Sequence, residues 1–428
     1  MKTFYSVLLA LMFAVGCGGS NPSGPVYGGE GGNGGSFLPG GNGGNGENGE
    51  GETFTGTAIG ANFNENIQEI AGVYKELNAT GTEYIRSFIN ITPMLKRSST
   101  EITGVNTAKI EESTLPAQFV AAKSKVADAK LVLSIKIVFE NLPGEVPAKG
   151  SAGVGYAIDC VRQLLEKDGL GSAIDVLVLG NEPMWENGDA AANPQNYADF
   201  IIEFASKAAS WKASKGWKYK IFAGALNRVS IQDSQNANIA KIINAAQASD
   251  YIDGLDIHLH NEDVAETEAS LKVVRDKYKF TKALMCSEVS MVWKLNSLMT
   301  ANLGSWGTEH GYSSTMKRYE WLNQTAKKAY AGTPVSSEEF ASFFNAISAY
   351  PRNWFTTYYN AFEKYKVSFI TPRFSAVESV DEITSETTMW ELGAIFSARF
   401  LGRAADGTMN PSPLVYPEAE ACRKRGVN

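Results

Sequence analysis

The stretch Ile174-Asp175-Val176-Leu177-Val178-Leu179-Gly180-Asn181-Glu182-Pro183 decides how the rest of the chain is interpreted. Its apolar run is almost unbroken, which is typical of a parallel strand that is covered on both faces. The run ends in Asn181 and Glu182, and Pro183 stops the strand. A carboxyl group at the mouth of an apolar strand is structurally costly. Apolar surroundings, however, raise the pKa of a carboxyl group and keep its proton available for donation.

A second stretch, Ala283-Leu284-Met285-Cys286-Ser287-Glu288, also ends an apolar run in a single glutamate. From residue 53 onward, such strand patterns alternate with helical ones. We expect strands at 53–60, 83–91, 131–139, 174–180, 219–226, 251–258, 281–287 and 367–372. We expect helices near 67–77, 116–129, 154–167, 193–215, 237–248, 264–277 and 353–365, and a closing helix near 389–400.

Eight strand–helix units predict an α/β fold, a closed (β/α)8 TIM barrel. An extended helical insertion, with helices near 314–330 and 337–349, separates strands 7 and 8. Ser336 and Glu339 form a capping-box pattern at the second of these helices. An open doubly wound sheet is the main alternative. Ala61-Asn62-Phe63-Asn64 stands where that fold would carry a glycine-rich phosphate loop, so the barrel is favoured.

The composition is that of a soluble globular protein. Of the 428 residues, 44% are apolar and 20% are charged, and the formal net charge is −7. Nucleic-acid binding needs clustered Lys and Arg. The short basic cluster Arg423-Lys424-Arg425 is expected to be a solvated tail. We therefore expect no nucleic-acid partner.

The N-terminal residues predict export and membrane attachment. Residues 1–17 combine a positive start, an apolar run too short to span a membrane, and Ala14-Val15-Gly16-Cys17. This end resembles a bacterial lipoprotein signal, in which Cys17 becomes lipidated; an ordinary cleaved secretory peptide is the alternative. Residues 18–52 are a glycine-rich flexible linker, and residues 53–428 form the barrel domain with a C-terminal tail. We expect a bacterial cell-surface or outer-membrane lipoprotein, or otherwise a secreted protein.

Three further cysteines, Cys160, Cys286 and Cys422, lie on a predicted helix, a predicted strand and the tail. Their odd number and scattered positions do not indicate a disulfide framework. We expect Cys160 and Cys286 to be buried free thiols.

Polar residues at the C-terminal ends of the strands collect into one ring in a parallel barrel. Glu182 and Glu288 would face each other across this ring. Two such carboxyl groups meet the need of glycoside hydrolysis, in which one protonates the leaving oxygen and the other attacks the anomeric carbon or activates water. In strand order, the residues at these ends are Asn62 and Asn64, Arg86, Glu140 and Asn141, Asn181 and Glu182, Asn227 and Arg228, His258 and His260, Glu288, and Arg373.

These features resemble the clan A glycoside hydrolases, the (β/α)8-barrel retaining glycosidases with catalytic glutamates after strands 4 and 7. The resemblance covers residues 53 to about 400, and its most specific motif is Gly180-Asn181-Glu182-Pro183. It implies that Glu182 is the general acid/base and that Glu288 is the nucleophile. It also implies that Asn181 holds the 2-hydroxyl of the sugar.

The resemblance further implies that Arg86 keeps the nucleophile ionised and that His258 or His260 lies near the sugar or the nucleophile. The chain departs from the clan at strand 3, where a histidine is common and Glu140-Asn141 stands here. It departs again at strand 8, where a sugar-stacking tryptophan is common and Phe369-Ile370-Thr371-Pro372-Arg373 stands here. These two roles are not carried over, and we expect a divergent family. Asn141 remains a candidate substrate contact.

Three tryptophans are candidates for sugar contacts, because aromatic faces stack on the apolar faces of sugar rings. Trp185 follows the strand-4 motif, Trp293 follows Glu288, and Trp306 lies in the insertion. We place Trp185 and Trp293 among the substrate-binding residues.

The resulting hypothesis is a secreted, surface-anchored retaining glycoside hydrolase that cleaves a β-linked polysaccharide or oligosaccharide by double displacement. β-Glucan is the first candidate substrate. We expect a monomer with no metal or organic cofactor. One alternative is a non-catalytic glycan-binding lipoprotein on a degenerate barrel. Another is a metal-dependent hydrolase, because His258 and His260 share one face of a strand.

Overall fold

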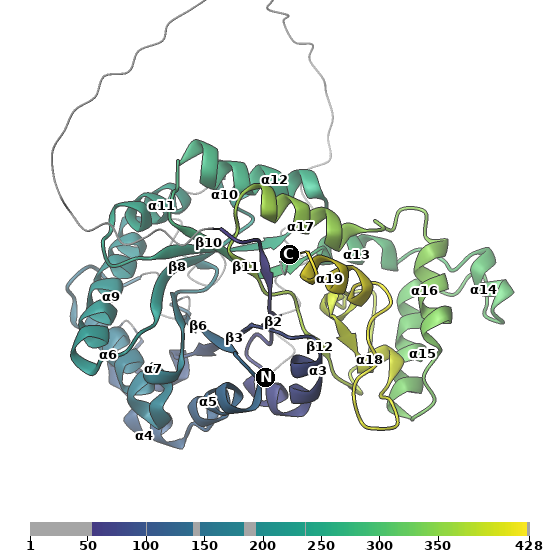
Figure 1. Ribbon diagram of the computed structural model, residues 1–428, viewed down its shortest axis with the longest axis horizontal. Helices are drawn as coiled ribbons and strands as arrows, with labels where there is room; N and C mark the ends of the chain where they lie inside the picture. The colour runs from purple at the N-terminus through teal and green to yellow at the C-terminus, as the bar shows by residue number, and fades with distance from the viewer. Residues whose placement is uncertain (1–53, 100, 140–145, 184–193, 236, 426–428) are drawn as a thin grey trace, which may run out of the picture. The chain divides into compact units, whose positions relative to one another are not determined.

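The computed structural model describes residues 54–99, 101–139, 146–183, 194–235 and 237–425. At its centre is a ring of parallel strands with helices packed around the outside (Figure 1). The predicted (β/α)8 barrel is therefore confirmed. The predicted signal segment, including Cys17, and the predicted linker lie outside the described residues.

The first barrel strand is interrupted at Gly60, and its two halves close the ring. β1 (Ala58–Ile59) pairs with the last strand, β11 (Phe369–Ile370), whereas β2 (Ala61–Asn62) pairs with β3 (Tyr84–Asn90). A Cβ atom at Gly60 would lie 2.4 Å from the carbonyl oxygen of Tyr84, so a side chain does not fit there. The ring continues through β6 (Lys130–Lys136), β7 (Val176–Leu179), β8 (Lys220–Asn227), β9 (Gly254–His260) and β10 (Ala283–Ser290).

Apolar side chains fill the barrel and the layer between strands and helices. Along β7, Val176 and Val178 belong to the inner cluster, whereas Leu177 and Leu179 pack outward into the main core. Both faces of the strand are buried, which explains its unbroken apolar run. The inner cluster comprises Val132, Val176, Val178, Phe222, Met285 and Phe369. Cys160, Cys286 and Cys422 are buried free thiols.

Helices follow the strands in the predicted order. They are α2 (Ile67–Ile70) and α3 (Tyr74–Ala79), α5 (Leu115–Lys125), α6 (Ala152–Glu166) and α7 (Leu170–Ala173), α9 (Pro194–Lys215), α10 (Val229–Gln235) and α11 (Asn238–Ala248), and α12 (Val264–Lys272). The segment between β3 and α5 also holds a hairpin that the sequence pattern does not predict. It consists of β4 (Leu95–Arg97) and β5 (Ile102–Val105), and α4 (Thr107–Glu112) follows it.

The predicted insertion between strands 7 and 8 is helical. It contains α13 (Val292–Met299), α14 (Ser305–Glu309), α15 (Arg318–Tyr330) and α16 (Ser337–Ala346), and α17 (Trp354–Lys364) leads back to β11. The Ser336 hydroxyl accepts the backbone N–H of Glu339 at 3.1 Å, as the capping pattern predicts. In Figure 1, α14, α15 and α16 lie to one side of the barrel, next to α18 (Ala398–Leu401).

The prediction of one closing helix over 389–400 is wrong. This segment forms a short 3₁₀ turn (Trp390–Gly393), then β13 (Phe396–Ser397), and only then α18. β13 pairs with β12 (Ser375–Ala376), which follows the last barrel strand. Pairing with a distant strand therefore overrides the local helical pattern.

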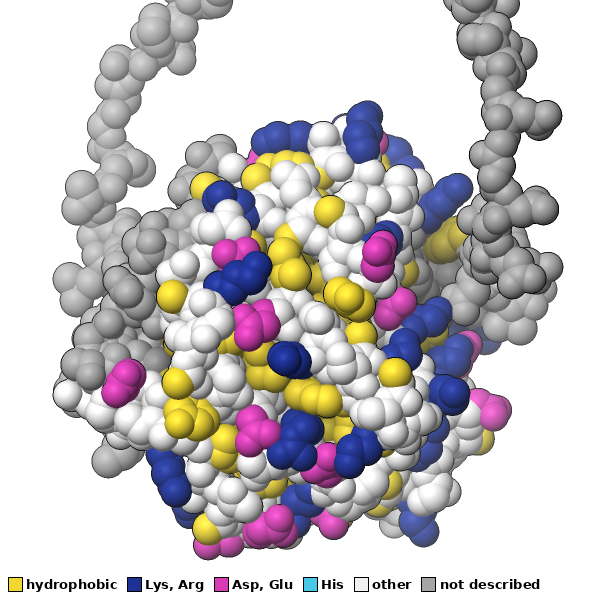
Figure 2. All heavy atoms as spheres, turned by 90° about the vertical axis from the view of Figure 1, so that its left-hand side faces the viewer, with side chains coloured by type: hydrophobic (Ala, Val, Ile, Leu, Met, Phe, Trp, Pro, Cys, Tyr) yellow, Lys and Arg dark blue, Asp and Glu magenta, His cyan; other side chains and the backbone are white. Residues whose placement is uncertain are grey.

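The face of the molecule in Figure 2 carries Lys and Arg side chains interspersed with Asp and Glu. Charges of both signs therefore lie close together on this face. Among the described helices, none is long and apolar enough to cross a membrane.

Candidate active site

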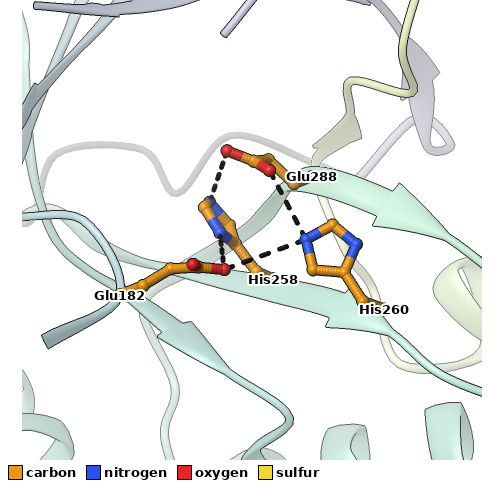
Figure 3. A group of neighbouring side chains, drawn as sticks. All are labelled: Glu182, His258, His260 and Glu288. Carbon is orange, nitrogen blue, oxygen red and sulfur yellow. Dashed lines mark hydrogen bonds and ion pairs between the residues drawn. The ribbon is translucent and has the colours of Figure 1, made fainter. Parts of the chain in front are cut away.

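Two glutamates meet at the C-terminal mouth of the barrel. Glu182 follows β7 and Glu288 lies near the end of β10. Figure 3 shows the two side chains converging with His258 and His260, which both lie on β9. One oxygen of each carboxyl group and one nitrogen of each imidazole all lie within 4.8 Å of one another. The structure thus brings together four residues that are far apart in the sequence.

The backbone after β7 aims Glu182 at the ring. Gly180 and Glu182 have positive φ angles of 101° and 40°, and the N–H of Glu182 donates to the carbonyl of Ala225 at 3.0 Å. A Cβ atom at Gly180 would lie 2.4 Å from the hydroxyl of Tyr197, so this turn requires glycine. A residue other than glycine with a positive φ angle is uncommon, and such residues concentrate at functional sites.

A β-bulge aims Glu288. The register of β10 against β9 shifts between Cys286 and Glu288, which leaves Ser287 as the extra residue. Met285 faces the barrel interior, so strict alternation would point Ser287 inward and Glu288 outward. The bulge turns Glu288 inward, while Ser287 keeps its own contacts inside the ring.

Arg86 is fully buried on β3 and organises the ring around Glu288. Its Nη1 lies 2.6 Å from Oε1 of Glu288. Its guanidinium also donates, at 3.0 to 3.2 Å, to Asn62, Asn64, Ser134 and Asn181. Because these acceptors hold the guanidinium from several sides, its charge stays fixed against the Glu288 carboxylate.

The surroundings of Glu288 favour its ionised form. Burial alone would raise its pKa, but the charges of His258 and Arg86, together with His260, hold that pKa well below its usual value. Burial also lowers the pKa of His258 itself. Arg86 is therefore the charge that persists beside Glu288 at neutral pH.

The surroundings of Glu182 favour its protonated form. Burial and the nearby charge of Glu288 raise the pKa of Glu182 to about 7, although His260, Lys136 and Arg86 act in the opposite direction. Near neutral pH, one carboxyl group of the pair therefore holds a proton while the other is ionised. Two carboxyl groups whose pKa values are pushed apart in this way form an acid and a nucleophile or base.

The four converging side chains have the donor types of a metal site, but their contacts do not fit one. Both ring nitrogens of His258 are within 3.0 Å of protein oxygens, on Glu182 and Ser287. The buried charge of Arg86 lies 2.6 Å from Glu288 and would oppose a second cation there. We therefore interpret the group as a site of proton transfer.

The structure places most of the predicted site residues in or beside the ring, but not all of them. Glu140, Asn141 and Trp185 lie outside the described residues. Arg228 forms an ion pair with Glu266 at 2.8 Å, and the Nε of Arg373 donates to the carbonyl of Ser375 at 3.0 Å. Trp306 is buried inside the insertion, where its ring stacks on His310 at 4.2 Å, so the idea that it contacts sugar is wrong.

Trp390 is a site residue that the sequence analysis missed. Its ring lies 4.8 Å from His260 and 5.9 Å from Trp293, in edge-to-face contacts. Trp293 therefore belongs to an aromatic wall beside the ring. A tryptophan that follows the last barrel strand thus reaches this side of the ring. Its position within a helical pattern gave no signal of that role.

Three more polar residues on the inward-facing side of the strands were missed. Lys136 lies on the inward register of β6 with Val132 and Ser134, and its Nζ is 5.1 Å from the ring of Phe88. Its charge acts on both Glu182 and His258. Asp256 and Ser287 are fully buried and contact each other below His258. An inward-facing polar residue within an apolar strand is the signal that could have identified Asp256.

No protein-family model and no curated protein matches this chain. Among solved structures, it is similar to the endo-beta1,6-glucanase BT3312, at 13% identity and a TM-score of 0.46, over 86% of this chain and 75% of that one. It is also similar to the exo-beta-1,4-mannosidase Op5Man5 from Opitutaceae bacterium strain TAV5, at 12% identity and a TM-score of 0.44, over 87% of this chain and 60% of that one. A third is XacCel5A, solved with cellopentaose, at 11% identity and a TM-score of 0.44, over 86% of this chain and 99% of that one.

Proposed function

We propose that this protein is a retaining glycoside hydrolase that cleaves a β-linked polysaccharide or oligosaccharide. The strongest support is that oxygens of Glu182 and Glu288 lie within 4.8 Å of each other, while the two groups favour opposite protonation states. Retaining enzymes hold their two carboxyl groups about 5–5.5 Å apart, whereas inverting enzymes leave roughly 6.5–9.5 Å for a water molecule. The short separation therefore supports retention.

In the first step, a carboxylate oxygen of Glu288 attacks the anomeric carbon, and the bond from that carbon to the leaving sugar breaks. The bonding electron pair moves to the leaving oxygen, which takes the proton of Glu182. Arg86 keeps the attacking carboxylate ionised, since its guanidinium lies 2.6 Å away. A covalent sugar ester on Glu288 results.

In the second step, water attacks the anomeric carbon of this ester. Glu182, now ionised, takes a proton from the water, and the bond between the sugar and Glu288 breaks. Two displacements at the same carbon retain its configuration. A pKa of about 7 suits Glu182 for both roles, because such a group gives and takes a proton near neutral pH.

Other residues around the ring would hold the sugar. Asn181 lies beside Glu182 and is oriented by Arg86 at 3.0 Å, which suits it to bind the 2-hydroxyl. His260, Trp293 and Trp390 would form one side of the sugar-binding site. β-Glucan is the first candidate substrate. Attachment to a bacterial membrane through Cys17, with residues 18–52 as a tether, belongs to the same proposal.

The test compares the full chain with its Glu288→Gln variant on a panel of β-1,3-, β-1,4- and β-1,6-glucans, xylan and mannan. Reducing ends are measured, and the configuration of the first product is followed by NMR. Glu76→Gln is a matched control, because Glu76 is also buried but accepts the N–H of Met409, away from the ring. We expect the wild type and the control to release sugar with retained configuration. The Glu288→Gln variant should release none.

Each other outcome has a clear meaning. Equal release by the wild type and Glu288→Gln would remove Glu288 from catalysis. Inverted product would contradict double displacement. Loss of activity with a chelator would favour a metal-dependent hydrolase. Binding to one of these glycans without release would favour a non-catalytic glycan-binding protein.

A further inference from the structure

A line of buried polar groups runs behind Glu182. It passes from Asp256 through Ser287 and His258 to the Glu182 carboxyl group. The first three side chains are fully buried. They come from neighbouring strands, β9 and β10, and Ser287 is the bulge residue of β10. Neither displacement step uses Asp256, although its carboxyl group is fully buried.

The contacts along this line are short and specific. Ser287 donates twice to Asp256, from its backbone N–H to Oδ1 at 3.0 Å and from its hydroxyl to Oδ2 at 2.5 Å. The Nε2 of His258 lies 3.0 Å from the Ser287 hydroxyl oxygen. The Nδ1 of His258 lies 2.9 Å from Oε1 of Glu182. Each group in the line therefore lies within hydrogen-bond distance of the next.

The positions of the protons along this line follow from the number of protons that each group carries. Burial raises the pKa of Asp256, whereas its two hydrogen bonds from Ser287 favour the carboxylate. With Asp256 ionised, Ser287 gives its one hydroxyl proton to Asp256, so the hydroxyl oxygen accepts from the Nε2–H of His258. A neutral imidazole carries one N–H, which leaves Nδ1 with a lone pair. That lone pair faces Glu182, so the favourable arrangement places a proton on the Glu182 carboxyl group.

We propose that Asp256 and Ser287 are positioning residues that fix His258 in its Nε2-protonated tautomer, so that the ring accepts a hydrogen bond from the acid proton of Glu182. This inference deepens the proposed function, because it explains how that acid keeps its proton until the substrate is bound. After donation, the carboxylate of Glu182 would face the Nδ1 lone pair. This repulsion favours the uptake of a proton from water in the second step.

The other groups around Glu182 do not replace this contact. Asn227 on β8 donates its Nδ2 to Oε1 at 2.8 Å, and His260 lies 3.8 Å away. Glu288, Lys136 and Arg86 act on Glu182 through their charges, from β10, β6 and β3. Among the described hydrogen-bond partners of Glu182, His258 is the one that can accept a proton.

The tautomer can be measured directly, because the chain has only three histidines. The full chain would be labelled with ¹⁵N-histidine, and the two-bond ¹⁵N–¹H correlation pattern would assign each tautomer near neutral pH. His310 is an internal reference of the opposite type. Its Nδ1 lies 2.9 Å from the carbonyl of Trp306, which can only accept, so His310 carries its proton on Nδ1. We expect the Nε2–H pattern for His258.

The Asp256→Asn variant should reverse the direction of the hydrogen bonds along this line. The backbone N–H of Ser287 holds the amide oxygen at the Oδ1 position, so the amide NH₂ faces the Ser287 hydroxyl. That hydroxyl must then donate to Nε2 of His258, and the proton of the ring moves to Nδ1. Ser270→Ala is the control, because Ser270 is a buried serine that contacts Ser230 rather than this line. It should leave the His258 pattern unchanged.

The readout needs no substrate, so it can fail or succeed independently of the proposed glycosidase activity. A Nδ1–H or doubly protonated His258 in the wild type would overturn the proposal, as would an unchanged tautomer in a folded Asp256→Asn variant. If that variant does not fold, the wild-type spectrum decides alone. As a second readout, the basic limb of kcat/KM should move to lower pH in Ser287→Ala but not in Ser287→Thr, which keeps the hydroxyl.

Discussion

Replacement of Arg86 by methionine tests the electrostatic basis of the site most directly. The guanidinium is fully buried, and its Nη1 lies 2.6 Å from a Glu288 oxygen. At an effective dielectric constant near 20, two unit charges about 4 Å apart interact by about 4 kcal/mol. Removal of one partner of a buried pair costs about 3–5 kcal/mol of stability. We expect the free energy of unfolding to fall by about that amount.

The same change should alter the pH dependence of activity. Glu288 must be ionised and Glu182 protonated, so activity is confined between the two pKa values. Because the charges of His258 and Arg86 hold the pKa of Glu288 well below its usual value, Arg86→Met should move the acid limb of kcat/KM to higher pH.

The sign of the stability change follows from the same shift. A carboxyl group with a lowered pKa adds stability above its unfolded pKa, and that stability is lost as pH falls through the folded pKa. Arg86→Met should therefore lose most stability at neutral pH and less in acid. The assay combines kcat/KM on an aryl β-glycoside with urea unfolding, both as functions of pH.

Arg275→Met provides the control for this experiment. Arg275 is a partly buried arginine that donates to backbone carbonyls, including those of Phe280 and Lys282, and has no described contact with the ring. It should lower stability and leave the acid limb in place. An acid limb that stays in place in a folded Arg86→Met variant would refute the reasoning, because the pKa of Glu288 would then not depend on Arg86.

Three further changes test the rest of the site. Glu182→Gln should lose about 10²–10⁴-fold of kcat/KM on polysaccharide but much less on a 2,4-dinitrophenyl glycoside, whose leaving group needs no acid; equal losses would contradict its role as the acid. Lys136→Met removes a charge that lowers the pKa of Glu182, so the basic limb of the pH–rate profile should move to higher pH. A basic limb that moves to lower pH would contradict this. Trp390→Ala removes a wall beside His260 and Trp293; KM for polysaccharide should rise, and an unchanged KM would place the ring outside the substrate site.

The barrel could be predicted because its signals are local. The unbroken apolar run in β7 and its abrupt end at Glu182 reflect burial on both faces of one strand. Each such strand carries this pattern independently of its neighbours, so eight of them suffice to indicate the architecture. The same reasoning failed at 389–400, where a helical pattern forms β13 because β12 is available to pair with it.

Only the parts of the site that depend on side-chain alternation and strand order could be predicted. These two features indicated that Glu182 and Glu288 share one ring, but the bulge at Ser287 has no signature in the sequence. Trp390 follows the last barrel strand at a distance, so its contact with His260 depends on how the chain folds back. Roles for Asn141 and Trp185 stay predictions, since both lie outside the described residues.

The different surroundings of the two glutamates support their proposed roles without reference to any relative. Glu288 has a permanent cation 2.6 Å away, which stabilises a carboxylate and opposes protonation. Glu182 faces the Nδ1 atom of His258, whose tautomer is set by Ser287 and Asp256. A group with a fixed cation beside it is a poor proton donor but a ready nucleophile. A group with a lone pair beside it holds its proton until a better acceptor, such as a leaving sugar oxygen, approaches. In the proposed mechanism the two side chains therefore could not exchange functions, although both are glutamates at strand ends of one barrel.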